Sequence, residues 1–211
     1  MSKYKIIGGR KLSGEIKIQG AKNEALQIIC ASLLTEEKVT IHNVPDILDV
    51  RNLYKILELS GAIVNFENGT LTIECKNIKD NFFISEEWMG AAGKLRGSLM
   101  LLGPALARFK KVKVPIFGGD KIGKRPIDTH LDGFVKLGYS YSDGALYYDE
   151  SNFKNVNTYP IILEEPSVTG TANILLAAAH SEKAVVIYNA ACEPYIQQLC
   201  KLLRSMGAKI A

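Results

Sequence analysis

The chain has 211 residues, of which 47% are apolar and 23% are charged, and this composition is typical of a globular protein rather than a disordered or collagen-like one. Its net charge of +4 is too small to indicate nucleic-acid binding, so we expect no nucleic-acid partner. The apolar run Leu99 to Ala107 is about half of the roughly 20 residues needed to cross a bilayer, and residues 1–11 lack a signal-peptide core. We therefore expect a cytoplasmic protein with no membrane partner.

The first predicted unit of structure begins with an apolar helix over residues 25–34. Charged residues and an alternating strand that ends at Ile41 follow it, and an amphipathic helix then runs to Gly61. Strands over residues 63–66 and 71–75 flank Asn68-Gly69, a pair that favours the type I′ hairpin turn. The predicted order is helix, strand, helix, strand, strand.

The same order recurs twice along the chain, which indicates an internal repeat. The second unit has an apolar helix over residues 95–107, a strand to Val114, a helix that ends at Gly138 and a hairpin around Asp143-Gly144. The third has an apolar helix over residues 171–179, a strand to Ile187 and a helix that ends at Gly207.

Each first helix is apolar nearly all round, as expected for helices that are buried on several sides. The pattern predicts a mixed α and β (α+β) fold, in which three helix-strand-helix-strand-strand units are related by a pseudo-threefold axis. Buried helices would lie at the centre and sheets outside.

The third unit stops at Ala211, where its hairpin should begin. A repeat without its last strands leaves backbone groups unpaired. We therefore expect either a longer protein or a partner that completes the unit.

One unit differs in length. From the strand to the capping glycine there are 20 residues in units one and three, but 24 from Val114 to Gly138 in unit two. The extra residues fall in residues 117–130. This segment overlaps a basic cluster, residues 108–125, which holds seven basic residues and one acid. Extra length in one copy of a repeat usually marks a functional loop.

This loop has the composition of an anion site. Gly118, Gly119 and Gly123 allow close approach of a ligand to the backbone. The donors for phosphate or carboxylate are Lys121, Lys124 and Arg125. A solvated glycine-rich hairpin is the alternative, and Asp120 is either a general acid or an ion-pair partner of its neighbours.

A second candidate is Lys22 in Gly20-Ala21-Lys22-Asn23, directly before the first buried helix. A cation at a helix N-terminus is disfavoured unless an anion also binds there. The alternative is an exposed loop lysine. Pseudo-symmetry predicts that the starts of the three central helices converge, with Arg96 and residues 165–171 near Lys22.

Cysteines and histidines indicate no metal site. Cys30 and Cys75 lie in predicted core elements. The sequence has no CxxC pair, and no histidine lies at ligand spacing from a cysteine. We expect buried structural thiols, no metal and no cofactor.

Four motifs in order resemble the UDP-N-acetylglucosamine enolpyruvyltransferase family. They are Gly20 to Leu26, Leu95 to Arg108, Gly118 to His130 and Pro166 to Ala179. The resemblance implies an αβ-prism fold of two three-unit domains, of which this chain is the N-terminal half. Residues 1–21 would then be the first strands of the domain that a missing C-terminal half completes, and residues 22–211 the three-repeat domain with its third repeat truncated.

The resemblance also implies site residues. Lys22 would be catalytic and contact phosphoenolpyruvate, Asn23 would lie beside it at the substrates, and Arg96 and Arg125 would contact substrates. Contacts to the UDP-sugar are implied for Arg125, Pro126, Ile127, Asp128, Thr129, Ser167 and Val168. Glu165 falls where some members have lysine.

Asp120 occupies the position at which most members of the family have a cysteine that protonates phosphoenolpyruvate and is alkylated by fosfomycin. The implied partners are phosphoenolpyruvate, UDP-N-acetylglucosamine and the missing half, and the implied product serves peptidoglycan synthesis. A non-catalytic nucleotide-sugar or anion-binding module is the alternative function, and a scaffold repeat is a weaker one.

Overall fold

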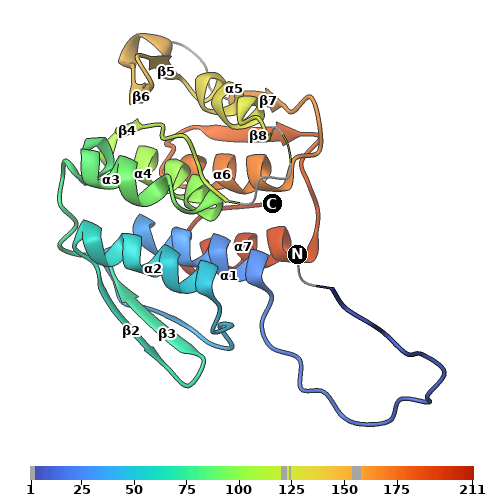
Figure 1. Ribbon diagram of the computed structural model, residues 1–211. Helices are drawn as coiled ribbons and strands as arrows, with labels where there is room; N and C mark the ends of the chain where they lie inside the picture. The colour runs from blue at the N-terminus through green and yellow to red at the C-terminus, as the bar shows by residue number, and fades with distance from the viewer. Residues whose placement is uncertain (1–2, 120–122, 124, 154–157) are drawn as a thin grey trace.

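The computed structural model describes residues 3–119, 123, 125–153 and 158–211 (Figure 1). Units one and two contain the predicted order of helix, strand, helix, strand, strand, and unit two begins with two short helices within residues 82–92 that the repeat did not predict. Unit one comprises α1 (Lys22–Ala31), η1 (Ser32–Leu34), β1 (Val39–Ile41), α2 (Leu48–Ser60), β2 (Ile63–Glu67) and β3 (Thr70–Glu74). Unit two comprises η2 (Phe82–Ile84), α3 (Glu86–Ala92), η3 (Arg96–Leu101), α4 (Leu102–Phe109), β4 (Lys111–Lys113), α5 (Asp128–Lys136), β5 (Tyr139–Ser142) and β6 (Ala145–Tyr148). Unit three comprises η4 (Glu150–Phe153), β7 (Thr158–Ile162), α6 (Val168–Ala178), β8 (Ala184–Tyr188) and α7 (Pro194–Ser205).

The first two units each form an antiparallel three-stranded sheet, with strand orders β1-β3-β2 and β4-β6-β5. The hairpin turns adopt the expected backbone conformation, because φ is positive at Asn68 and Gly69 and again at Asp143 and Gly144. Positive φ at both central residues is the property of a type I′ turn, whose twist matches the strands. Both predicted hairpins are confirmed.

The third unit contains a strand that the repeat pattern did not predict. β7 pairs in parallel with β8, and α6 connects them. Parallel neighbours need a crossover connection, and a helix is its usual form. Within the described residues no hairpin follows α7, so this sheet has two strands where the others have three.

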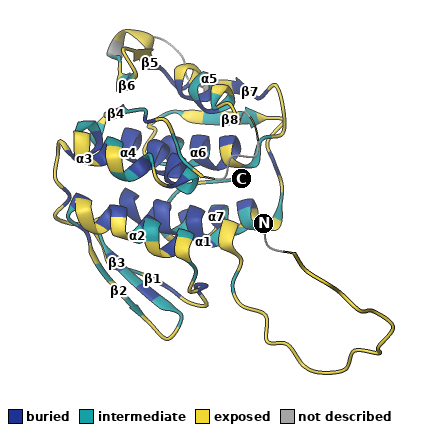
Figure 2. Cartoon of the chain, viewed as in Figure 1, coloured by how far each residue is buried: buried dark blue, intermediate teal, exposed yellow. Residues whose placement is uncertain are grey.

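Most residues of the central helices α1, α4 and α6 are buried, as predicted (Figure 2). The middle one begins as a 3-10 helix, η3, where the sequence predicted continuous α-helix. Pro104 explains the difference, because it has no N–H to bond the carbonyl of Met100 and its ring clashes with that carbonyl in an α-helix.

α4 and α6 lie in close contact at Gly103. A Cβ atom at this position would lie 2.3 Å from the backbone oxygen of Asn173 and 2.6 Å from Asn173 Oδ1. Backbone cannot move aside without shifting the whole helix. The absence of a side chain at Gly103 therefore sets the distance between the two helices.

We expect Gly103→Ala to reduce the free energy of unfolding by about 1–3 kcal/mol, the range for an overpacked core. Chemical denaturation measures this loss. Gly90→Ala is the matched control, because a Cβ atom at Gly90 meets nothing within 4 Å. Equal stability of the two variants would contradict the close contact.

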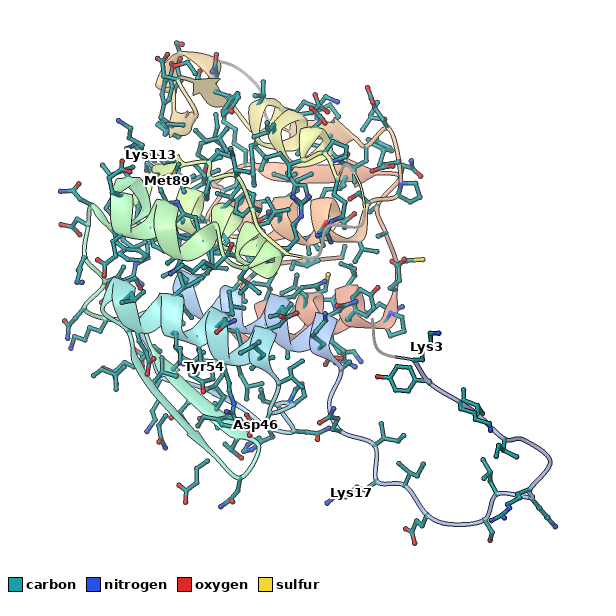
Figure 3. The ribbon with its side chains drawn as sticks, viewed as in Figure 1. Lys3, Lys17, Asp46, Tyr54, Met89 and Lys113 are labelled. Atoms are coloured by element: carbon teal, nitrogen blue, oxygen red, sulfur yellow. The ribbon has the colours of Figure 1, made fainter. Side chains whose placement is uncertain are left out.

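Residues 3–21 form neither helix nor strand, and they extend away from the body of the molecule (Figure 1). Their side chains, Lys3 and Lys17 among them, project into open space (Figure 3). Large apolar side chains in this segment are more than 80% exposed: Tyr4, Ile6, Ile7, Leu12, Ile16 and Ile18. Their assignment as strands of a second domain stays a prediction. In the part of the chain that the structure describes, no helix is long and apolar enough to cross a membrane.

Candidate functional site

The starts of the central helices lie at one end of the molecule (Figure 1). At η3, a Cβ atom on Gly97 would lie 3.1 Å from Leu26 Cδ1 of α1. Between α5 and α6, a Cβ atom on Gly170 would lie 3.0 Å from Thr129 Cγ2. The starts of η3 and α1 therefore lie side by side, and the start of α6 lies beside that of α5. Convergence of residues 165–171 on Lys22 stays a prediction.

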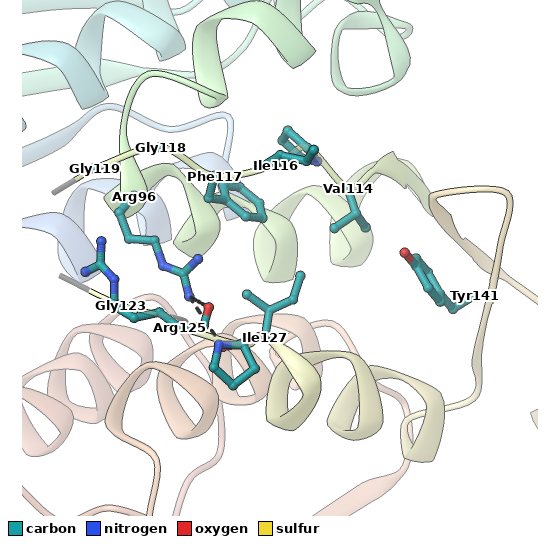
Figure 4. Close-up of a pocket in the computed structure, with 12 residues that line it drawn as sticks. Arg96, Val114, Ile116, Phe117, Gly118, Gly119, Gly123, Arg125, Ile127 and Tyr141 are labelled. Atoms are coloured by element: carbon teal, nitrogen blue, oxygen red, sulfur yellow. Dashed lines mark hydrogen bonds between the residues drawn. The ribbon is translucent and has the colours of Figure 1, made fainter. Parts of the chain in front are cut away.

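A cavity of about 510 Å³ opens at this end, between η3 and the start of α5 (Figure 4). The charged side chains among its described lining residues are Arg96 and Arg125, and Tyr141 lies at its far side. Among the described residues, the lining consists of Arg96, Val114, Pro115, Ile116, Phe117, Gly118, Gly119, Gly123, Arg125, Pro126, Ile127 and Tyr141. The cavity thus joins a basic end to an apolar wall, which suits an organic anion.

Arg96 holds the segment that follows the glycine-rich loop. Its Nη2 donates to the backbone oxygen of Arg125 at 2.7 Å and to that of Pro126 at 3.4 Å. Burial, and then the positive charge of Arg125, lower the pKa of Arg96. Two guanidinium groups therefore lie close enough to repel each other. An anion between them would relieve that repulsion.

The glycines of the loop are needed for packing of the chain itself. A Cβ atom on Gly118 would lie 2.2 Å from the backbone oxygen of Gly93. Gly119 has a φ of 108°, and its Cβ atom would lie 2.9 Å from Arg96 Cβ. Close approach of the loop to residues 93–96 thus brings it beside both arginines. Gly123 has a φ of 117°, and a Cβ atom there would meet none of the described residues within 4 Å.

Lys22 begins α1 and forms an ion pair with Asp49 of α2, with 3.1 Å between Nζ and Oδ2. The pair is about half exposed, so it contributes little to stability. Neither Lys22 nor Asn23 lines the large cavity. They follow Gly20 and Ala21, which line a smaller cavity of about 140 Å³.

The remaining predicted contacts lie at the starts of α5 and α6. Ser167 is the N-cap of α6, where its hydroxyl accepts the Gly170 N–H at 3.2 Å. Thr129 Oγ1 donates to Glu165 Oε1 at 3.4 Å, so the two helix starts are bonded to each other. Asp128 lies in the first turn of α5, and Val168 begins α6.

Three loop residues with predicted roles lie outside the described residues. They are Asp120, Lys121 and Lys124. Nothing in the structure tests their roles, which stay predictions.

Cys30 and Cys75 are buried, as expected for structural thiols. Burial raises the pKa of both thiols, that of Cys75 to about 11, so neither is a reactive thiolate at neutral pH. Within residues 3–119, 123, 125–153 and 158–211, no three His, Cys, Asp or Glu side chains group at metal-binding distance.

Sequence reasoning did not identify three residues of this region: Asp49, His130 and Asn173. Asp49 pairs with Lys22, and His130 bonds Asn173 beneath the start of α5. One signal was available in the sequence, because Asn173 is a lone amide in an otherwise apolar helix. The other two have ordinary sequence surroundings.

Comparisons with known proteins agree with this architecture. A family model described as EPSP synthase (3-phosphoshikimate 1-carboxyvinyltransferase) matches residues 6–211. Proteins named UDP-N-acetylglucosamine 1-carboxyvinyltransferase match the whole chain, at 48% identity in Bacteroides thetaiotaomicron and in Porphyromonas gingivalis and 42% in Borreliella burgdorferi. The chain spans about half the length of these relatives, 48–49% of each.

Solved structures with the same fold extend the comparison. The enolpyruvyl transferase NikO from Streptomyces tendae has a TM-score of 0.77 at 21% identity, with 97% of this chain and 47% of that chain covered. An EPSP synthase from Acinetobacter baumannii has a TM-score of 0.63 at 16% identity, with 94% and 44% covered. The fold is that of the enolpyruvyl transferases. Because the family match extends over residues 6–211, the chain belongs to the EPSP synthase family.

Proposed function

We propose that this chain is the N-terminal half of a UDP-N-acetylglucosamine 1-carboxyvinyltransferase, which acts in peptidoglycan synthesis in the cytoplasm. The observation that carries the proposal is the match of the entire chain, at up to 48% identity, to relatives of that name. The cavity beside Arg96 and Arg125 supports it, because both substrates of such an enzyme are anions.

Residues 22–211 would form one wall of the active site, and a second half would form the other. The exposed apolar side chains of residues 3–20 support this division. Alternating apolar residues on an unpaired segment are suited to a sheet in another domain. Residues 1–21 would then supply the first strands of the second domain.

In the proposed reaction, phosphoenolpyruvate is bound by Lys22 and Asn23, and the UDP-sugar by the segment Arg125 to Thr129 with Ser167 and Val168. Arg96 and Arg125 would hold negative charge in the cavity. Lys22 must exchange its ion pair with Asp49 for the substrate, a small cost because the pair is exposed.

The chemistry needs an acid rather than a metal or cofactor. The 3′-hydroxyl oxygen of the sugar would bond C2 of phosphoenolpyruvate and lose its proton to a base, while Asp120 delivers a proton to C3. The tetrahedral intermediate would then lose a proton from C3 and phosphate from C2, which restores the double bond. A general acid of this kind usually contributes about 10²–10⁴-fold to the rate.

The division between two halves is tested by phosphate release from phosphoenolpyruvate and UDP-N-acetylglucosamine. We expect turnover by the full-length protein and none by residues 1–211 alone, with circular dichroism as a check that the short form is folded. Robust turnover by a folded short form would contradict the two-half site. A non-catalytic binding module predicts no turnover by either form.

A further inference from the structure

A buried polar network joins three helices beneath the segment Arg125 to Thr129. His130, in the first turn of α5, is 3% exposed, and Asn173 in α6 is fully buried. Polar groups are costly in such surroundings unless each one has a partner. The partners come from three elements, η3, α4 and α6.

The hydrogen bonds fix the orientation of the Asn173 amide. The Gly103 N–H donates to Asn173 Oδ1 at 2.8 Å, and Asn173 Nδ2 donates to the backbone oxygen of Leu99 at 2.9 Å. Because a backbone N–H can only donate and a carbonyl can only accept, the amide cannot be flipped. Its second hydrogen therefore points at His130 Nδ1, 3.0 Å away.

This orientation in turn fixes the tautomer of His130. Nδ1 must accept, so the ring is neutral and carries its proton on Nε2. Nε2 then donates to Thr169 Oγ1 at 3.2 Å. In a protonated ring, the Nδ1–H of His130 would face the Nδ2–H of Asn173, and two donors would repel each other.

The charged groups around the ring favour the same state. Burial, and then the positive charge of Arg96 in η3, lower the pKa of His130 to about 4. Glu165, the acid that precedes α6, accepts the Thr129 hydroxyl. The network therefore stays neutral at physiological pH.

Glycines bring α5 and α6 together around the network. A Cβ atom on Gly133 would lie 2.3 Å from Ile174 Cδ1, and one on Gly170 would lie 3.0 Å from Thr129 Cγ2. Ile174 and Thr129 fit into the spaces that these glycines leave, so the two helices approach closely, but these apolar contacts contain no hydrogen bond. The bonds of His130 to α6 supply the directional restraint that the glycine contact lacks.

We propose that His130 and Asn173 are positioning residues, which lock the start of α5 to α6 and so hold the segment Arg125 to Thr129 opposite Arg96. His130 would act through the backbone of this segment rather than by touching a substrate. The identity of the ligand, the UDP-sugar, rests on the proposed function. The positioning of the segment rests on the network alone.

The decisive variant is Asn173→Asp in the full-length protein. The carboxylate still accepts the Gly103 N–H but can donate neither to the Leu99 oxygen nor to Nδ1 of His130. The ring must therefore carry its proton on Nδ1 or become an imidazolium. Thr171→Val is the matched control. It removes a hydroxyl from the same buried helix, α6, but this hydroxyl accepts the Ala191 N–H and lies outside the network.

The first readout is the ¹⁵N spectrum of labelled histidine, with the amide signals of Ile127 and Thr129. We expect the Nε2–H form of His130 in the wild type down to about pH 5, and the altered form in Asn173→Asp with a raised pKa. The two amide signals should move with the same pH midpoint as the ring. The control should keep the wild-type ring signals.

The second readout is steady-state kinetics. We expect Asn173→Asp to raise KM for UDP-N-acetylglucosamine about fivefold or more, with kcat changed less than about twofold, because a misplaced binding segment weakens ground and transition states alike. If Asn173→Asp does not fold, Thr169→Val removes only the Nε2–H acceptor at an exposed position. It should then shift the His130 Nε2 signal and raise the same KM.

An unchanged tautomer in Asn173→Asp would overturn the inference, as would a changed tautomer with unmoved amide signals and KM. For Thr169→Val, an unmoved Nε2 signal and KM would do the same. A wild-type protein that transfers no enolpyruvyl group would overturn the proposed function instead. In that case the ring and amide signals alone decide whether the network positions the segment.

Discussion

Replacing Arg125 with alanine in the full-length protein is expected to lower kcat/KM by at least about a hundredfold, or roughly 3 kcal/mol of charge-assisted contact. Arg125 lies in the large cavity beside Arg96, and its charge lowers the pKa of Arg96. Two repelling guanidinium groups gain most when an anion binds between them. Phosphate release at varied concentrations of each substrate measures the loss.

Two further variants make the Arg125 experiment specific. Arg125→Lys keeps the charge but loses the planar pair of donors, so its activity should fall between the wild type and Arg125→Ala. Arg204→Ala removes an arginine from the far end of α7, where Nε donates to the Ile210 oxygen, and should leave kcat/KM unchanged. Near-normal kinetics of Arg125→Ala would contradict a role in anion binding and would favour the alternative, a solvated hairpin.

Replacing Asp120 with asparagine is expected to lower kcat by about 10²–10⁴-fold, the usual loss when a general acid is removed. The amide keeps the shape of the side chain but has no acidic proton to give to C3 of phosphoenolpyruvate. Asp128→Asn is a matched control, because it removes the same charge. We expect it to change the affinity for the UDP-sugar rather than kcat. An Asp120→Asn variant as active as the wild type would show that another group donates the proton.

The same position determines the response to fosfomycin. A carboxylate attacks an epoxide far less readily than a thiolate does, so the wild-type protein should resist time-dependent inactivation. Asp120→Cys should keep measurable turnover, because a thiol also donates a proton, and should become sensitive to the drug. Covalent inactivation of the wild type at Asp120 would contradict this assignment of the loop.

The sequence predicts the local turns of this fold well, because single residues determine them. Asn68-Gly69 and Asp143-Gly144 tolerate the positive φ values that a type I′ turn needs, and both hairpins form there. Gly61, Gly138 and Gly207 have positive φ where their helices end. Each of these features depends on neighbours in the chain and needs no tertiary contact.

The parts that the sequence did not predict depend on distant contacts. β7 has no counterpart in the predicted repeat. It is a strand because it pairs with β8, which follows it in the chain after α6. The pairing of Lys22 with Asp49 and of His130 with Asn173 joins residues 27 and 43 positions apart. Spacing along a chain does not encode which of many polar residues will meet.

The candidate site divides in the same way. Loop length and charge identified residues 117–130. The structure places four residues of the predicted set together in one cavity: Arg96, Arg125, Pro126 and Ile127. Lys22 and Asn23 lie outside that cavity. Their role in substrate binding stays a prediction.

Acceptor choice tests the central claim most directly, because the family model is named for transfer to 3-phosphoshikimate and the relatives for transfer to UDP-N-acetylglucosamine. The full-length protein is incubated with phosphoenolpyruvate and both acceptors in equal amounts, and the products are identified by mass spectrometry. We predict the enolpyruvyl ether of UDP-N-acetylglucosamine and no product from 3-phosphoshikimate. Enolpyruvyl transfer to 3-phosphoshikimate would contradict the account.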